Sequence, residues 1–149
     1  MIRLIRALVI VEAATFLIAG ALHLGVSVPL ASAIGEPLMP QAGGPESVIG
    51  LVLVAGAVAS FLLQGRGARW TLVGTLVFAI LGTLVGISAI NAGLGPRTDA
   101  GEVYHRVILA SLVVTLALTL LAGVRSDRST AWVVRPSVEL ADEPDESLA

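Results

Sequence analysis

The chain has 149 residues, of which 56% are hydrophobic and only 13% are charged, and its mean hydropathy is +0.92. A soluble domain usually carries about 25% charged residues, so this composition excludes a soluble globular protein and favours one that contacts the lipid bilayer. The sequence has no cysteine, which excludes disulfides and thiolate metal sites, and it has no basic patch that would bind nucleic acid.

Four apolar segments are each long enough to cross a hydrocarbon core as a helix, which takes about 17–25 residues. Backbone groups in lipid must bond within their own segment, so such segments form helices. We therefore expect an all-α fold, a polytopic antiparallel four-transmembrane-helix bundle in residues 1–138. The four predicted helices are about 5–25, 46–63, 70–93 and 103–124.

The arginines predict the orientation of this bundle. Seven of the nine basic residues flank the same ends of the predicted helices, and the positive-inside rule makes that side cytoplasmic. Both termini are then cytoplasmic, in a multi-pass protein of the cell (plasma or inner) membrane. The seven are Arg3, Arg6, Arg66, Arg69, Arg125, Arg128 and Arg135.

The segments outside the helices carry further expectations. The N-terminal region also reads as a signal peptide, because Ala31-Ser32-Ala33 resembles a cleavage site, although its apolar stretch is long and contains Glu12. Residues 26–45 hold four prolines and three glycines, which predicts a loop rather than one regular helix. The tail 139–149 is acidic and is expected to be disordered on the cytoplasmic side.

Small and weakly polar residues predict which faces pack together, because they let membrane helices approach closely. On the second, third and fourth segments such residues recur at helical spacing and define one inward line each. These lines are Glu46, Gly50, Leu53, Ala57, Ser60 and Gln64; Thr75, Gly82, Gly86 and Gly93; and Ser111, Thr115 and Thr119.

The first apolar segment carries two ionisable side chains, Glu12 and His23. At about 100° per residue they lie on one stripe of a helix, separated by about 16 Å. A carboxyl near mid-membrane is costly and marks a functional site by default. The alternative is a structural acid bonded to Ser60, Thr75 or Thr119. Both interpretations require Glu12 to point into the bundle.

His23, Glu46, Tyr104 and His105 would meet where three helices reach the outer side of the bundle. Three interpretations remain open. The residues could form a structural hydrogen-bond cluster. His23, Glu46 and His105 could bind a metal, or the two histidines a haem. The third is a ligand-binding pocket for a quinone-like or other lipophilic small molecule.

The pocket interpretation requires open space along the stripe between Glu12 and His23. Small residues would leave that space, and Phe16 would form its floor or stack on a flat ligand. We therefore expect a cavity beneath His23. Its predicted walls are Ala19, Gly20, Glu46, Gly50 and Gly86.

The first two segments resemble the DoxX-like group of small four-helix membrane proteins. Arg6 leads the first helix, which closes on AGALHL at 19–24, and Glu46 opens the second within PESVIGLVLVAG at 45–56. The resemblance implies a membrane subunit linked to quinone or thiol oxidoreductases, with Glu46 as the matching polar position. Neither His23, although it lies within AGALHL, nor the Tyr104–Arg106 sequence YHR matches a feature of that group.

The expected function is a small integral membrane protein with a polar ligand site at the outer mouth of the bundle. Its ligand-binding residues would be Glu12, Phe16, His23, Glu46, Tyr104 and His105. The site would be redox-associated, with a membrane oxidoreductase as a partner. The alternatives are an accessory subunit without a ligand and a haem- or metal-binding protein. The sequence leaves open whether the protein is an enzyme.

Overall fold

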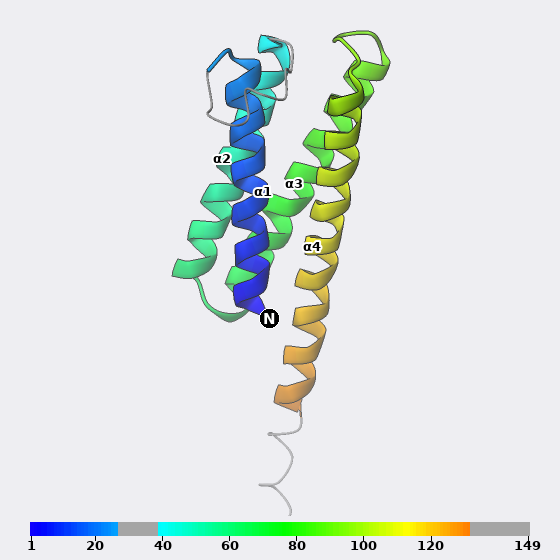
Figure 1. Ribbon diagram of the computed structural model, residues 1–149. Coiled ribbons are helices and arrows are strands. Elements are labelled where there is room, and N and C mark those ends of the chain that lie inside the picture. Colours follow the sequence, from blue (N-terminus) through cyan, green and yellow to red (C-terminus); the bar gives the residue numbers. More distant parts are fainter. Residues whose placement is uncertain (27–38, 132–149) are drawn as a thin grey trace, which may run out of the picture.

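The computed structural model describes residues 1–26 and 39–131, with side chains as far as Gly123. Throughout this part the regular structure is helical, with no strand, which confirms the all-α prediction. The helices are α1 (Ile2–His23), α2 (Pro40–Leu62), α3 (Gly65–Asn91) and α4 (Asp99–Ala131) (Figure 1). All four are long and apolar enough to cross a membrane, α4 through its part Asp99–Gly123.

All four helices begin earlier than their hydropathy indicated, and two of the starts have a clear local cause. α2 begins at Pro40 rather than Glu46, because a proline fits the first helical position, where its missing N–H is not needed. Pro45 lies inside α2 and removes a single backbone hydrogen bond. α4 begins at Asp99 because Thr98 caps it, its hydroxyl accepting from the Gly101 N–H at 3.0 Å.

The described helices extend past the predicted C-terminal ends in one case only. α4 continues to Ala131 instead of ending near residue 124, whereas α1 ends at His23 and is closed by Gly25 at φ +84°. The Ala31-Ser32-Ala33 sequence, Arg135 and the acidic tail 139–149 lie outside the described residues.

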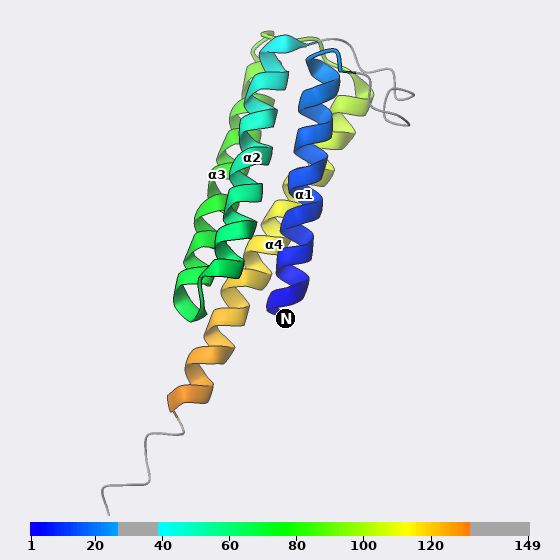
Figure 2. The same ribbon diagram turned by 90° about the vertical axis from the view of Figure 1, so that its left-hand side faces the viewer.

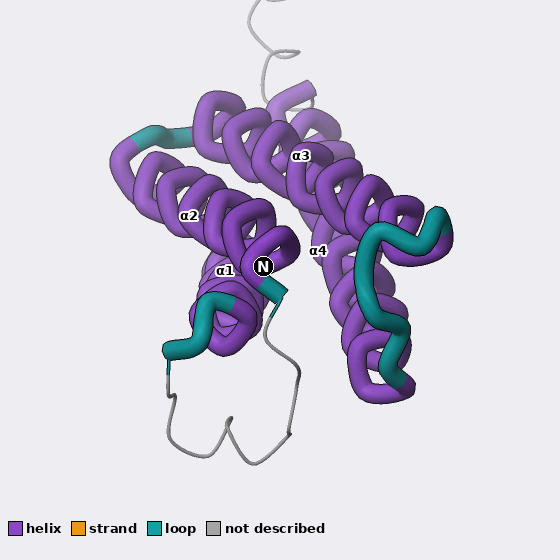
Figure 3. Tube along the Cα trace, turned by 90° about the horizontal axis from the view of Figure 1, so that it is seen from above, coloured by secondary structure: helices purple, strands orange, loops and turns teal. Residues whose placement is uncertain are grey.

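The helices pack chiefly on their neighbours in the chain. The contact between α1 and α2 is the most extensive, those of α3 with α2 and with α4 are smaller, and α1 and α4 share the smallest contact of the four pairs. Figures 2 and 3 show α1 and α2 side by side, and Figure 3 shows α4 set apart from α1. The seam between α1 and α4 is therefore the least closely packed part of the bundle.

Glycines bring α1 and α2 together. A Cβ at Gly20 would lie 2.5 Å from Ser47 Oγ and 2.9 Å from the Gly43 carbonyl oxygen, and one at Gly50 would lie 2.7 Å from Leu17. Only glycine allows this approach of two helix backbones, as small residues do at membrane helix interfaces generally. These two glycines thus belong to a helix contact.

The bundle core contains large apolar side chains from all four helices, including Phe16, Leu53, Leu76 and Leu112. The inward line of α2 is buried as expected, apart from Gln64, which follows the helix and is exposed. The line predicted for α3 is wrong. The buried residues of α3 are Ala68, Leu72, Leu76, Ala79 and Thr83, not the line that begins at Thr75.

The reason for the error on α3 is that its small residues face a neighbouring helix rather than the centre. Thr75 contacts Gly56, and Gly82 contacts Ile49, both on α2. Gly93 lies beyond α3 in an exposed turn. Large exposed apolar side chains cover the outside of the bundle, for example Val11, Val85 and Val107, which suits contact with acyl chains.

Candidate functional site: a cavity between α1 and α4

The end of α1 is joined to the start of α2 by a buried polar pair. His23 Nδ1 and Glu46 Oε2 lie 2.6 Å apart, and the two residues are only 5% and 7% exposed. The Met39 N–H donates to the His23 carbonyl at 3.1 Å, which fixes the same junction through the backbone. The pair therefore sets how these two helix ends meet.

Two aromatic side chains of α4 lie at the same end of the bundle. The Tyr104 ring meets Phe16 of α1 edge-on with centroids 6.4 Å apart, and it lies 5.2 Å from the His105 ring. The Tyr104 hydroxyl is buried and has no hydrogen-bond partner among the described residues. A buried hydroxyl without a partner is costly, so a ligand or water that bonded it would be favoured.

His105 is oriented by its own helix. Its Nδ1 lies 2.7 Å from the Gly101 carbonyl oxygen, and because a carbonyl only accepts, Nδ1 is the nitrogen that carries the proton. The Nε2 atom of the neutral ring is then an acceptor. His105 can therefore bind a ligand hydroxyl, or donate from Nε2 when the ring is charged.

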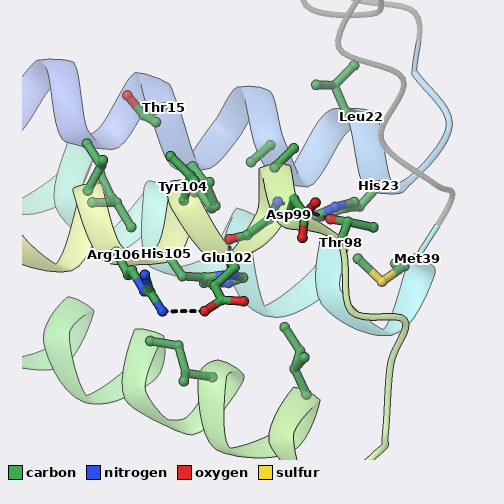
Figure 4. Close-up of a pocket in the computed structure, with 18 of the residues that line it drawn as sticks. Thr15, Leu22, His23, Met39, Thr98, Asp99, Glu102, Tyr104, His105 and Arg106 are labelled. Carbon is green, nitrogen blue, oxygen red and sulfur yellow. Dashed lines mark hydrogen bonds and ion pairs between the residues drawn. The ribbon is translucent and has the colours of Figure 1, made fainter.

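A cavity of about 1050 Å³ lies between α1 and α4. Its walls are mostly apolar, and it is large enough for a drug-sized molecule. Several residues that line it, such as Val11, Val103 and Val107, are also exposed on the outside of the bundle, so the cavity opens sideways. Figure 4 shows Tyr104, His105 and His23 along it.

Charged side chains lie at the rim of the cavity between α1 and α4 (the first cavity), near the first turns of α4. Arg106 forms an ion pair with Glu102 (Figure 4), and Arg97 lies 3.4 Å from the same carboxylate. Asp99 and Thr98 line the rim as well. All of these belong to the start of α4 or the turn before it.

Glu12 lines the same cavity lower down and is 2% exposed. Its Oε1 accepts two hydrogen bonds from α4, from Ser111 Oγ and from Thr115 Oγ1, both at 2.7 Å. Its other oxygen, Oε2, is buried and has no partner within residues 1–26 and 39–123. The expectation that Glu12 points inward is confirmed, and its partners are residues that sequence reasoning did not choose.

The three partners proposed for Glu12 bond elsewhere. Ser60 Oγ accepts from Arg6 Nε at 3.1 Å, while Thr75 and Thr119 donate to backbone carbonyls of their own helices. Ser111 and Thr115 belong to the polar line predicted for α4, so the signal was present. Which residues of that line lie level with Glu12 could not be predicted from the sequence.

A second, smaller cavity of about 180 Å³ lies on the other side of His23 and His105, which line both. Phe16, Glu46 and Gly86 line the second cavity, whereas Ala19 lines the first. The predicted single cavity is thus divided. Gly20 and Gly50 line neither cavity, because the contact between α1 and α2 fills the space beside both glycines.

The three-ligand metal set that the sequence left open as one interpretation is not formed among the described residues. Across the described part of the chain, no three histidine, aspartate or glutamate side chains gather closely enough to hold a metal ion. His23 bonds Glu46, but the ring of His105 is turned to the Gly101 carbonyl. His23, Glu46 and His105 therefore border a cavity rather than converge on one point.

Comparison of the chain with models of known protein families, with curated proteins and with solved structures found no match. The resemblance to the DoxX-like group stays a prediction. The class that the fold and the site define is a multi-pass, four-helix protein with an apolar cavity between α1 and α4. Its function must be inferred from the chemistry of that cavity.

Proposed function

We propose that this protein binds a lipophilic small molecule in the cavity between α1 and α4. The observation that carries this function is the combination of apolar walls with two buried polar atoms that lack partners among the described residues, Glu12 Oε2 and the Tyr104 hydroxyl. Pockets for small molecules characteristically pair apolar walls with a few placed polar groups. A bound molecule would satisfy both atoms.

A quinone-like molecule fits the upper part of the cavity. The Tyr104 hydroxyl can donate to a carbonyl or accept from a hydroxyl, and His105 offers Nε2 beside it. Tyr104 and His105 both line this cavity, and aromatic side chains there favour a flat molecule. In this proposal the chain binds and orients the molecule, and a membrane oxidoreductase partner exchanges electrons with it.

The proposal includes a membrane topology. The helices would cross the cytoplasmic membrane of the cell in antiparallel order with both termini inside. The support comes from Arg3 and Arg6 at the start of α1, and Arg66 and Arg69 at the start of α3. The end of the bundle that carries His23 and Tyr104 would then face outward.

An accessory subunit without a ligand is a second candidate, favoured by a different observation. Buried polar contacts of α1 link it to other helices at three levels. His23 pairs with Glu46, Glu12 with Thr115, and Arg6 with Ser60. Such contacts fix the register of helices in lipid, with or without a ligand.

Analysis of what co-purifies with the protein separates these candidates. We expect organic extraction of the purified protein, followed by mass spectrometry, to yield one lipophilic compound in near-stoichiometric amount. Val107 lines the cavity at its exposed side, away from the packed core. Val107→Trp therefore narrows the opening without overpacking the bundle, and it should reduce the yield several-fold.

Val114→Trp is the matched control, because Val114 is similarly exposed on the same helix but lines neither cavity. It should leave the yield unchanged. Recovery of bulk lipid alone, in equal amounts from all three proteins, would favour the accessory subunit. A visible absorption band typical of haem in the same preparation would indicate a haem-binding protein instead and would also contradict the proposal.

A further inference from the structure

The two oxygens of the Glu12 carboxyl differ in the hydrogen bonds that they accept. One oxygen accepts two hydroxyl hydrogen bonds, and the other, equally buried, accepts none from the described residues. A carboxyl oxygen can accept two hydrogen bonds, so Oε1 is saturated, and in the ionised carboxylate Oε2 keeps its full capacity as an acceptor. Since Glu12 lines the first cavity, the unsatisfied capacity belongs to the site proposed above.

The two hydroxyls that bond Glu12 differ from others in the helices. Thr15, Thr83, Ser88 and Thr119 each donate to the carbonyl four residues earlier in their own helix. Ser111 and Thr115 donate to Glu12 instead. The carboxyl is therefore held as an acceptor by two donors, which orients it and leaves its second oxygen to accept from the cavity.

Among the residues that the structure describes, no basic side chain lines the deep end of the cavity. Of its two arginines, Arg97 precedes α4 and Arg106 turns its guanidinium back along the helix to Glu102, with which both pair. Ser111 is seven residues beyond Tyr104 on α4, which places the Glu12 carboxyl about 10 Å below the aromatic rings at helical rise. The deep end thus presents an acceptor to the ligand, well apart from Tyr104 and His105.

We infer that Glu12 Oε2 accepts a hydrogen bond from a hydroxyl or a protonated amine of the bound molecule, so that the site selects apolar molecules with a hydrogen-bond donor over those with acceptors alone. The inference rests on the proposed function and adds a ligand class to it. A quinol would qualify and its quinone would not. A long-chain alcohol or amine would qualify as well.

The test compares apolar probes of equal length that differ in one polar group: 1-decanol, decylamine and 2-decanone. Thr15→Cys gives the full chain a single thiol that lines the cavity near Glu12, because the sequence has no cysteine of its own. The protein is placed in lipid nanodiscs, and the rate of maleimide labelling is measured with each probe at equal mole fraction. Phe61→Cys, exposed and outside both cavities, controls for general effects on labelling.

We expect 1-decanol and decylamine to protect the thiol of Thr15→Cys half-maximally at concentrations at least tenfold below that of 2-decanone. The alcohol and amine arms distinguish the two sources of the donor, the neutral hydroxyl and the ammonium. Equal or better protection by 2-decanone would overturn the inference while leaving the proposed function standing. Protection by none of the probes would overturn both.

Glu12→Gln in the Thr15→Cys background sharpens the test. The amide oxygen can replace Oε1 toward Ser111 and Thr115, which places an N–H₂ donor where Oε2 was. The preference should then reverse, with 2-decanone protecting at a lower concentration than 1-decanol. Thr71→Val, a polar substitution on α3 that lies outside both cavities, should leave the preference unchanged. An unchanged preference in Glu12→Gln would contradict the inference. If Glu12→Gln does not fold, the comparison of the three probes in the Thr15→Cys protein with Glu12 intact still tests the inference.

Discussion

His23 Nδ1 and Glu46 Oε2 lie 2.6 Å apart at the point where α1 ends and α2 begins, and both residues are almost wholly buried. The bond joins residues 23 positions apart and lies between the two cavities, because His23 lines both. Its strength should therefore affect the stability of the bundle and the shape of the site together.

Removing one partner of this pair should cost more than removing both. His23→Ala leaves the Glu46 carboxyl buried without its imidazole, which should lower the free energy of unfolding by about 3 kcal/mol. The double variant His23→Ala, Glu46→Leu should recover part of this loss, because it leaves no buried charge. Denaturant unfolding in mixed micelles measures both variants and the single variant Glu46→Leu, and strictly additive effects would contradict a direct interaction.

Gly20 should tolerate no side chain. The Cβ of Gly20→Ala would press on Ser47 Oγ and on the Gly43 carbonyl, which belongs to the α2 backbone and cannot turn away. Overpacking of this kind costs about 1–3 kcal/mol. Gly44→Ala is the matched control, since no described atom lies within 4 Å of a Cβ at that position. Equal thermal stability of the two variants would show that α1 and α2 do not approach this closely.

The hydroxyls that bond Glu12 should be coupled. Thr115→Val keeps the volume but removes a donor, and we expect a loss of about 1–2 kcal/mol in unfolding free energy. Ser111→Ala should cost a similar amount, and the double variant should cost more than the sum, because Oε1 then has no donor. Thr119→Val, whose hydroxyl bonds its own helix, is the control and should cost little. Additivity in the double variant would argue against shared use of Oε1.

Thiol accessibility tests the proposed topology. Leu94→Cys lies in the exposed turn after α3, and Gly67→Cys lies in the first turn of α3 at the opposite end of that helix. An impermeant maleimide added to intact cells should label the Leu94→Cys protein and not the Gly67→Cys protein, and both should react after permeabilisation. Labelling of Gly67→Cys alone in intact cells would reverse the orientation inferred from the arginines.

The first helix was the part of the site best predicted from sequence. Glu12, Phe16 and His23 share one face at helical spacing, and all three are buried. This prediction needs only the geometry of one helix and the cost of placing a carboxyl in lipid. The predicted topology, which puts both residues on the same side of the membrane, indicated that Glu46 of α2 could meet His23.

Contacts between helices far apart in the chain were not predictable in the same way. Whether Glu12 meets Ser60, Thr75 or Thr115 depends on the rotation and vertical offset of each helix, which no single segment determines. On α3, Leu72 and Leu76 face the core while Thr75 and Gly82 face α2. Small residues indicated a close helix contact correctly, but not that the contact lay beside the core.

The cavity between α1 and α4 opens on the side of the bundle, past Val11 and Val107. A molecule that enters there comes from among the acyl chains and never has to be released into water. Its occupancy follows its abundance in the membrane, and each added methylene raises that abundance about fourfold at a fixed aqueous dose. Ranked by aqueous dose, longer homologues would therefore look like tighter ligands while making no new contact with the protein.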